Sequence, residues 1–258
     1  MAEQLIVDFA GPVAMATVNR PSSHNAMTWP MYEALAQFCA RVDASPEVRV
    51  AVLRGAGGKA FVSGTDINHF RGFRGADDGV EYERGIESVL RRLEEVTVPT
   101  IAAVDGYAVG GGLAMAMACD VRICTPNAKF GLPIARTLGN CVSMPTYARL
   151  VQLIGAARTL HLIYTAGFVD GEQAVRIGLA SELVADAGLD ARLDELCMQI
   201  AGQAPLTMRA SKIAVRRLRD HAPLPADEDL ISLCYGSDDF REGVTAFLDK
   251  RPPRWRGH

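Results

Sequence analysis

Strand-like runs of apolar residues alternate with helical patterns through much of the chain, and this alternation constrains the fold more than any other feature. The runs 5–9 and 13–19 flank an Ala-Gly-Pro turn, which predicts a hairpin, and buried strands are predicted at 48–53, 101–104 and 121–124. Between the strands, apolar residues recur at the spacing of a helix. The pattern predicts an α/β fold.

The chain from about Leu189 onward contains helical patterns alone. They cover residues 189–203, 206–220, 227–235 and 238–249. We therefore divide the chain into a core, residues 1–188, and a C-terminal helical region, residues 189–258. The first helix of this region has an apolar face that a small domain is not expected to bury by itself. The face consists of Leu189, Leu193, Leu196 and Ile200.

Composition excludes several classes of protein. The chain has 258 residues, of which 49% are hydrophobic and 22% charged, as in ordinary globular proteins. A net charge of −3 disfavours nucleic acid as a partner. The longest apolar stretch, 101–119, contains Asp105 and several glycines, so we expect no membrane span. The N-terminus lacks the basic segment of a signal peptide, which favours a cytoplasmic location.

The cysteines and histidines do not form a metal-binding pattern. Six cysteines are scattered along the chain without a Cys-x-x-Cys pair, and there are five histidines. We expect free thiols and no metal site.

A glycine-rich turn, residues 105–112, follows one predicted strand and opens a predicted helix. It lacks the Gly-Lys-Ser/Thr ending of a P-loop, and Met115 stands where a dinucleotide-binding motif needs its third glycine. Glycine N–H groups at a helix N-terminus can instead stabilise an anion that forms during a reaction, as in an oxyanion hole. The alternative is a tight turn packed against small residues, which the turn alone favours.

Several other motifs occur in a fixed order along the chain. They are Asn19-Arg20-Pro21, Asn25-Ala26-Met27, residues 61–67 (FVSGTDI), Gly110-Gly111-Gly112, Cys119-Asp120, residues 128–133 (AKFGLP) and residues 247–252 (FLDKRP). From Ile6 to Gly257 this ordered set resembles the enoyl-CoA hydratase/isomerase (crotonase) superfamily. The resemblance implies a spiral of ββα units, followed by helices that form a homotrimer or a dimer of trimers.

The resemblance also implies an acyl-CoA substrate, with no cofactor beyond its CoA moiety. The thioester oxygen would lie between the backbone N–H groups of Thr65 and Gly111. The residues that would bind the rest of the substrate are spread over both ends of the chain. Backbone carbonyls around His24, Ala26 and Ser63 would hold the adenine end of CoA. Asp66 and Ile67 would complete the loop after Thr65. Phe247 and Lys250 would close over the CoA of a neighbouring subunit.

The chain departs from the family at both catalytic glutamates of the hydratases. Ala114 occupies the position three residues after the middle glycine, and Ile134 follows the Phe-Gly-x-Pro motif. No Asp or Glu occurs between Asp120 and Asp170, so a shift in register does not restore either carboxylate. Since general acid–base groups contribute about 10²–10⁴-fold each, ordinary enoyl-CoA hydration is doubtful.

Other polar residues could take over the chemistry. Asn140 and Cys141 are catalytic candidates, and Cys141 is either a nucleophile near a helix N-terminus or a small packed thiol. Arg136 could bind a substrate carboxylate or form a structural salt bridge. His69 is expected at the surface. Glu81, Glu83 and Glu87 lie in a segment that lines acyl pockets in the family, so one of them could face inward, although a charged helix usually turns its acids to solvent.

Three hypotheses follow for the function. The first is an acyl-CoA enzyme with an unusual set of catalytic residues, most simply a lyase or an isomerase. Decarboxylation and thioester hydrolysis are also open to it. The second is a slow or atypical enoyl-CoA hydratase. The third is a non-catalytic acyl-CoA-binding protein.

Overall fold

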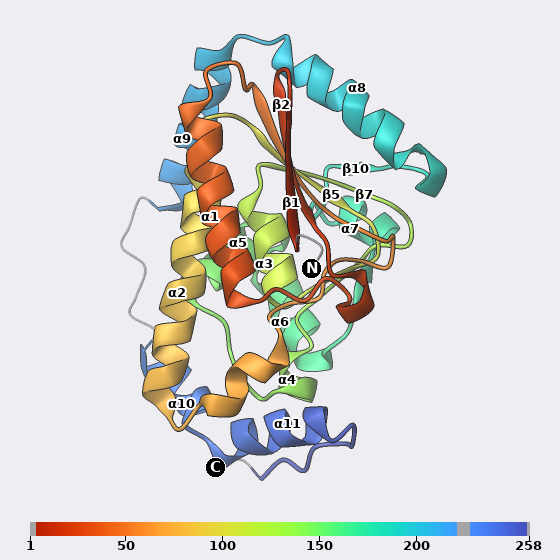
Figure 1. The fold of residues 1–258 in the computed structure, drawn as a ribbon. Coiled ribbons are helices and arrows are strands. Elements are labelled where there is room, and N and C mark those ends of the chain that lie inside the picture. The colour runs from red at the N-terminus through yellow and green to blue at the C-terminus, as the bar shows by residue number, and fades with distance from the viewer. Residues whose placement is uncertain (1–3, 221–227, 257–258) are drawn as a thin grey trace.

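Two sheets form the centre of the computed structural model, which describes residues 4–220 and 228–256 (Figure 1). The larger sheet has the order β1-β2-β3-β5-β7-β10. Its strands are β1 (Leu5–Ala10), β2 (Val13–Val18), β3 (Val50–Gly55), β5 (Thr100–Val104), β7 (Val121–Cys124) and β10 (Glu182–Leu183). β1 and β2 form the predicted antiparallel hairpin, and the remaining neighbours pair in parallel.

The smaller sheet has the order β4-β6-β8-β9. Its strands are β4 (Ala60–Val62), β6 (Tyr107–Val109), β8 (Lys129–Gly131) and β9 (Val169–Asp170). The chain therefore adds one strand to each sheet and then a helix, as in β3-β4-α2 and β5-β6-α3, where α2 is Ala76–Glu94 and α3 is Gly111–Ala118. The repetition of this unit confirms the predicted spiral of ββα units.

Helices cover both faces of the larger sheet because its central strands are apolar on both sides. Ala51 and Leu53 of β3 face the main core, together with helices α1 (Trp29–Ala44), α2 and α3. Val50 and Val52 of the same strand face a second cluster that contains Leu189 and Leu193 of helix α8 (Leu189–Ala201). The alternation along one strand thus places α1, α2 and α3 on one face and α8 on the other.

The remaining helices follow the spiral. They are α4 (Ile134–Thr137), α5 (Met144–Ile154), α6 (Ala156–Thr165), α7 (Gly171–Arg176), α9 (Pro205–Arg219), α10 (Glu228–Tyr235) and α11 (Asp238–Leu248), with short 3₁₀ turns η1 (Pro21–Ser23), η2 (Ile67–Gly72) and η3 (Asp186–Gly188). Helix α2 begins at Ala76, within residues 71–79, whose three glycines, two arginines and two aspartates are typical of a loop. The Asp78 carboxylate accepts hydrogen bonds from the backbone N–H groups of Arg74 and Gly75, which caps the helix at this point.

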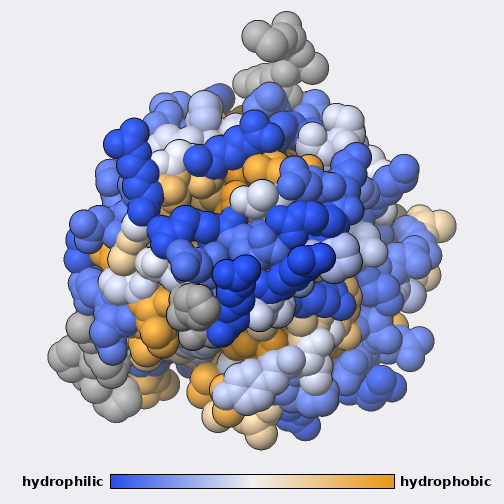
Figure 2. Space-filling model, turned by 90° about the horizontal axis from the view of Figure 1, so that it is seen from below, coloured by the Kyte–Doolittle hydropathy of each residue, from blue (hydrophilic) through white to orange (hydrophobic). Residues whose placement is uncertain are grey.

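The C-terminal helices differ in how closely they pack on the core. Helix α10 packs against α2, and α11 packs against η2. Helix α9 contains no buried residue, and it exposes 77% of Leu206 and 74% of Leu218. Figure 2 shows the lower face of the molecule, which is largely hydrophilic with scattered hydrophobic patches. Among the described residues, no helix is long and apolar enough to cross a membrane. The division at residue 188 stays a prediction.

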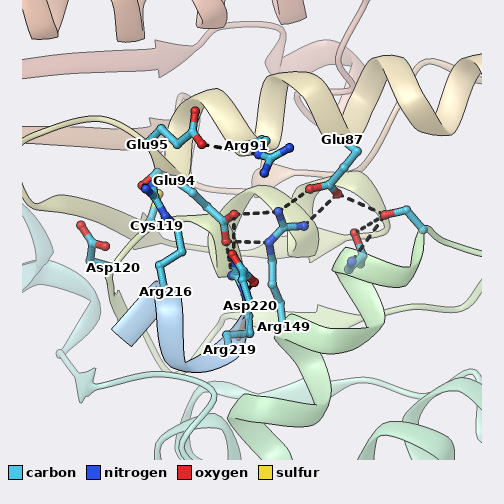
Figure 3. A network of polar contacts seen from close by, with 12 residues as sticks. Glu87, Arg91, Glu94, Glu95, Cys119, Asp120, Arg149, Arg216, Arg219 and Asp220 are labelled. Atoms are coloured by element: carbon cyan, nitrogen blue, oxygen red, sulfur yellow. Dashed lines mark hydrogen bonds and ion pairs between the residues drawn. The ribbon is translucent and has the colours of Figure 1, made fainter. Parts of the chain in front are cut away.

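A buried network of ion pairs ties α2 to α5 and α9 (Figure 3). The side chain of Arg149 is 2% exposed and makes two hydrogen bonds to the carboxylate of Glu87, at 2.5 and 2.9 Å, and two to that of Glu94, at 2.7 and 2.8 Å. Arg219 of α9 reaches the same Glu94 carboxylate and also pairs with Asp220. Paired carboxylates and guanidinium groups satisfy each other in the low-dielectric interior.

Candidate active site

Thr65 and Gly111 lie next to each other, at turns that follow strands β4 and β6. A Cβ atom added to Gly111 would lie 3.7 Å from Thr65 Oγ1 and 3.8 Å from the Cα atom of Gly64. Gly64 has φ +106°, a conformation that favours glycine. Within residues 4–220 and 228–256, neither the N–H of Thr65 nor that of Gly111 is paired with an acceptor. Two such donors in adjoining turns can both point at one oxyanion.

Hydrogen bonds of the flanking residues fix the turn that carries Thr65. The N–H of Met27 donates to the carbonyl of Gly64, and the N–H of Asp66 donates to the carbonyl of Met27, both at 2.8 Å. The Thr65 side chain is held as well, since its Oγ1 lies 2.8 Å from the hydroxyl of Tyr32 and 2.6 Å from that of Tyr82. Burial raises the pKa of both phenols, so they remain neutral near pH 7. The donor N–H is therefore preorganised.

Close packing holds the second donor at the N-terminus of α3. A Cβ atom on Gly112 would clash with the backbone of Val62, so only glycine lets α3 approach β4 this closely. The N–H of Gly110 donates to the carbonyl of Gly131 at 3.0 Å, which leaves the N–H of Gly111 as the donor that opens the helix. The sequence did not reveal Tyr32 and Tyr82, because their partner Thr65 is 33 and 17 residues away.

The two positions that lack glutamate are apolar and buried. Ala114 in the first turn of α3 is 4% exposed, and Ile134 at the start of α4 is 7% exposed. Neither side chain can accept or donate a proton, and the core packs around them. That these residues replace the two catalytic glutamates of the hydratases stays a prediction.

A different carboxylate is buried near this site. Glu83 of α2 is 6% exposed, and the expectation that the acids of this segment face solvent is wrong for it. The Tyr235 hydroxyl donates to Glu83 Oε1 at 2.7 Å, and the backbone N–H of Ser143 donates to Oε2 at 3.0 Å. The ring centroids of Tyr82 and Tyr235 are 6.3 Å apart, so contacts through these two residues connect Thr65 to Glu83.

Asn140 and Cys141 lie beside this carboxylate. The Asn140 side-chain amide donates to the Tyr235 hydroxyl at 3.1 Å and to the carbonyl of Cys141 at 3.2 Å. Cys141 is 6% exposed and donates to the carbonyl of Leu230 at 3.6 Å. A hydrogen bond with Cys141 lowers the pKa of the Cys234 thiol to about 7. No motif singles out Cys234, which comes from α10.

Three of the other residues considered in the sequence, Asp66, Ile67 and His69, follow Thr65 in the same loop and in η2. The Asp66 carboxylate pairs with Arg20 at 3.1 Å and accepts two hydrogen bonds from Asn68, so it supports the loop as expected. Ile67 packs against an aromatic cluster. His69 stacks on Trp29 with ring centroids 5.7 Å apart, and burial lowers its pKa.

The predicted adenine-binding carbonyls already have donors within the chain. The carbonyl of His24 accepts from the N–H of Ser63 at 3.2 Å, and that of Ala26 accepts from the Arg20 guanidinium at 2.6 Å. Each carbonyl oxygen has a second lone pair that could still accept from an adenine amino group. The predicted binding of adenine by these carbonyls therefore stays a prediction.

The remaining predicted contacts lie at the surface. The side chains of Arg136, Phe247 and Lys250 are exposed. A cavity of about 460 Å³ lies away from this site, between the core and α9, beside Glu94 and Lys212. No group of three or more His, Cys, Asp or Glu side chains that could hold a metal ion occurs in the described part of the chain.

Comparison with known proteins gives consistent results. The family model described as enoyl-CoA hydratase/isomerase matches residues 8–258. A short-chain-enoyl-CoA hydratase of Clostridium acetobutylicum is 33% identical over 96% of this chain and 95% of its own length. A carnitinyl-CoA dehydratase of Salmonella typhi is 31% identical over the full length of both chains. A methylmalonyl-CoA decarboxylase in complex with 2-nitronate-propionyl-CoA has a TM-score of 0.91 at 26% identity, over 99% of both chains.

Proposed function

Because the chain belongs to the enoyl-CoA hydratase/isomerase family, we propose that it is an enzyme that processes an acyl-CoA thioester through an oxyanion or enolate. The thioester oxygen accepts hydrogen bonds from the N–H groups of Thr65 and Gly111. The observation that carries this proposal is the pair of unbonded N–H groups in adjoining turns, held in place around the Thr65 hydroxyl. The CoA moiety belongs to the substrate, and no further cofactor is needed.

The chemistry follows from the charge on the thioester oxygen. Loss of a proton or substituent from the α-carbon moves an electron pair into the carbonyl group, so negative charge develops on its oxygen. Preorganised N–H donors stabilise that charge, and one donor is worth about 10²–10³-fold in rate. This favours a lyase or isomerase type of reaction. A panel of acyl-CoA thioesters, with calorimetry for binding and mass spectrometry for products, tests the proposal. No binding by any member at millimolar concentration would reject it.

Hydration of crotonyl-CoA is expected to be far below the ordinary enzymatic range of about 1–10³ s⁻¹. The reason is that Ala114 and Ile134 cannot take part in proton transfer. The measurement is the loss of the enoyl absorbance with wild-type protein. A rate inside that range would show that another acid–base pair performs ordinary hydration. The change Ala114→Glu together with Ile134→Glu should raise the rate if the protein tolerates two buried acids, which a thermal melt checks.

Decarboxylation is a second candidate reaction. It is favoured by the TM-score of 0.91 to a methylmalonyl-CoA decarboxylase and by the apolar residues Ala114 and Ile134. When a carboxylate leaves as CO₂, its bonding electrons form the same enolate, and no base is required for that step. Release of CO₂ from methylmalonyl-CoA, with propionyl-CoA as product, would select this reaction.

The protein is expected to sediment as a trimer or as a dimer of trimers. Helix α9 buries none of its residues within one chain and exposes Leu206, Val215 and Leu218 by 59–77%. Faces of this kind are ordinarily covered by another subunit. Sedimentation equilibrium at micromolar concentration is the measurement, and a single 27.7 kDa species would contradict the expectation.

A further inference from the structure

The oxyanion hole needs a partner that moves protons, and the described acids near it differ in how they are engaged. Asp66 is paired with Arg20, and Glu87 makes a bidentate ion pair with Arg149. Glu81 is exposed to solvent. Glu83 is buried on the side of α2 that faces the loop before α5, where it accepts from the Tyr235 hydroxyl and the Ser143 N–H. Among these four acids, Glu83 is the most deeply buried, and the hydrogen bonds described for its carboxylate come from a phenol and a backbone N–H.

The position of Glu83 relative to the oxyanion hole is fixed by a row of tyrosines. The Tyr82 hydroxyl lies 2.6 Å from Thr65 Oγ1, its ring is 6.3 Å from that of Tyr235, and the Tyr235 hydroxyl donates to Glu83 at 2.7 Å. Helix α2 also packs against α3, which carries Ala114. The helix that carries Glu83 therefore contacts the helix that carries the position of the first family glutamate.

An independent observation comes from Asn140. Its Oδ1 atom is buried and has no hydrogen-bond partner among the described residues, whereas its Nδ2 donates to the Tyr235 hydroxyl and the Cys141 carbonyl. Turning the amide over would place Oδ1 against that carbonyl, so the orientation is determined by the contacts. A buried acceptor without a donor is unfavourable, because it has lost its hydrogen bonds to water and gained none in the protein. The atom is therefore suited to a donor that arrives with the substrate, such as a hydroxyl group or a water molecule.

We propose that Glu83 is the proton-transfer group of this enzyme, that Tyr235 positions it, and that Asn140 Oδ1 receives a hydroxyl or water donor at the acyl chain. The proposal rests on the function proposed above. The Glu83 carboxylate takes a proton from the α-carbon, the C–H electron pair forms the Cα–C1 double bond, and the carbonyl π electrons move to the oxygen held by Thr65 and Gly111. Return of a proton from Glu83 reverses the step. The substrate class is a CoA thioester with an α-hydrogen.

The test is α-proton exchange in D₂O with acetyl-, butyryl- and octanoyl-CoA, read by mass spectrometry of the thioester. The wild-type protein is expected to introduce deuterium into at least one of them. Glu83→Gln should lower the exchange rate at saturating thioester by about 10²-fold or more, with the half-saturating concentration unchanged within about threefold. Glu81→Gln, on the exposed side of the same helix, is the matched control and should exchange like the wild type.

A second variant keeps the test decisive if Glu83→Gln is poorly folded. Tyr235→Phe removes the donor to Glu83 and retains the ring, so we expect a slower saturated rate with an unchanged half-saturating concentration, together with a lower thermal midpoint because two buried groups lose a partner. A purely structural role would lower the midpoint but leave the saturated rate of the folded protein unchanged. Binding of a thioester without exchange by the wild type, or exchange that survives both substitutions, would overturn the role of Glu83 and leave the proposed function standing. Absence of thioester binding in calorimetry would reject the proposed function itself.

Discussion

Replacing Arg149 by methionine is expected to lower the free energy of unfolding by about 3–5 kcal/mol. The guanidinium of Arg149 is 2% exposed and makes four hydrogen bonds to the carboxylates of Glu87 and Glu94. Methionine keeps much of the volume but leaves the half-buried carboxylate of Glu87 without this cation, and the buried carboxylate of Glu94 with Arg219 alone. Urea unfolding at a fixed protein concentration is the measurement, since self-association also contributes to stability.

A matched control is available at the surface. Arg192 also contacts two acids, Glu182 and Glu195, but its side chain is 29% exposed. Arg192→Met should therefore change the free energy of unfolding by at most about 1 kcal/mol. Adding Glu87→Gln and Glu94→Gln to Arg149→Met should recover part of the loss, because the uncompensated charges are removed. Equal effects of Arg149→Met and Arg192→Met would contradict the assigned role of burial.

The same network predicts the response to acid. Burial by itself raises the pKa of Glu94, but the hydrogen bonds and charges of Arg149 and Arg219 outweigh it and hold the pKa below its ordinary value of 4.5. The group therefore stabilises the folded state above pH 4.5, and this stabilisation is lost as the pH falls through the folded-state pKa. Unfolding measured between pH 7 and pH 3 should show a smaller acid loss for Glu94→Gln than for the wild type.

Replacing Gly111 by proline is expected to lower kcat/KM by about 10²–10³-fold relative to Gly111→Ala. Proline removes the N–H that we assign to the oxyanion hole, whereas alanine keeps it. Gly111 is the first residue of α3, where proline is well tolerated, and the two residues add the same Cβ atom, 3.0 Å from the Tyr32 hydroxyl. Crowding at Tyr32 is therefore the same in both variants. The difference in kcat/KM between them reports the loss of the N–H donor and the change in the space around it.

The rate is measured with the thioester that the panel identifies as substrate. Thermal midpoints of the two variants should agree within a few degrees, which shows that the turn is intact. If Gly111→Pro and Gly111→Ala were equally active, the N–H of Gly111 would play no part in the reaction, and the proposed oxyanion hole would be wrong.

The strands and most helices were predictable from the sequence because their patterns are local. Apolar alternation gave the hairpin and the buried strands, and the glycine-rich turn predicted the start of α3 within one residue of Gly111. The start of α2 was not predictable from spacing, because a single side chain, Asp78, caps it among glycines and arginines that are typical of a loop.

The environment of Glu83 depends on residues that are distant in sequence. Its donors, Ser143 and Tyr235, are 60 and 152 positions away, and no pattern within α2 distinguishes it from the exposed Glu81. The substitutions Ala114 and Ile134 could be recognised from the sequence because they stand in motifs. The side chain proposed to compensate for them lies outside every motif, so only the tertiary structure brings it to the site.

Helix α2 carries Glu83 at one point and the ion-paired Glu87 and Glu94 further along. Any movement of this helix away from α5 would pull two carboxylates away from Arg149 at the same time. Variation in chain-length preference is therefore expected to accumulate in the loop around Asn140 and in α10, which supply Asn140 and Tyr235 next to Glu83 and form no ion pair with Arg149. A library intended to change the substrate of this enzyme would randomise those segments and leave α2 as it is.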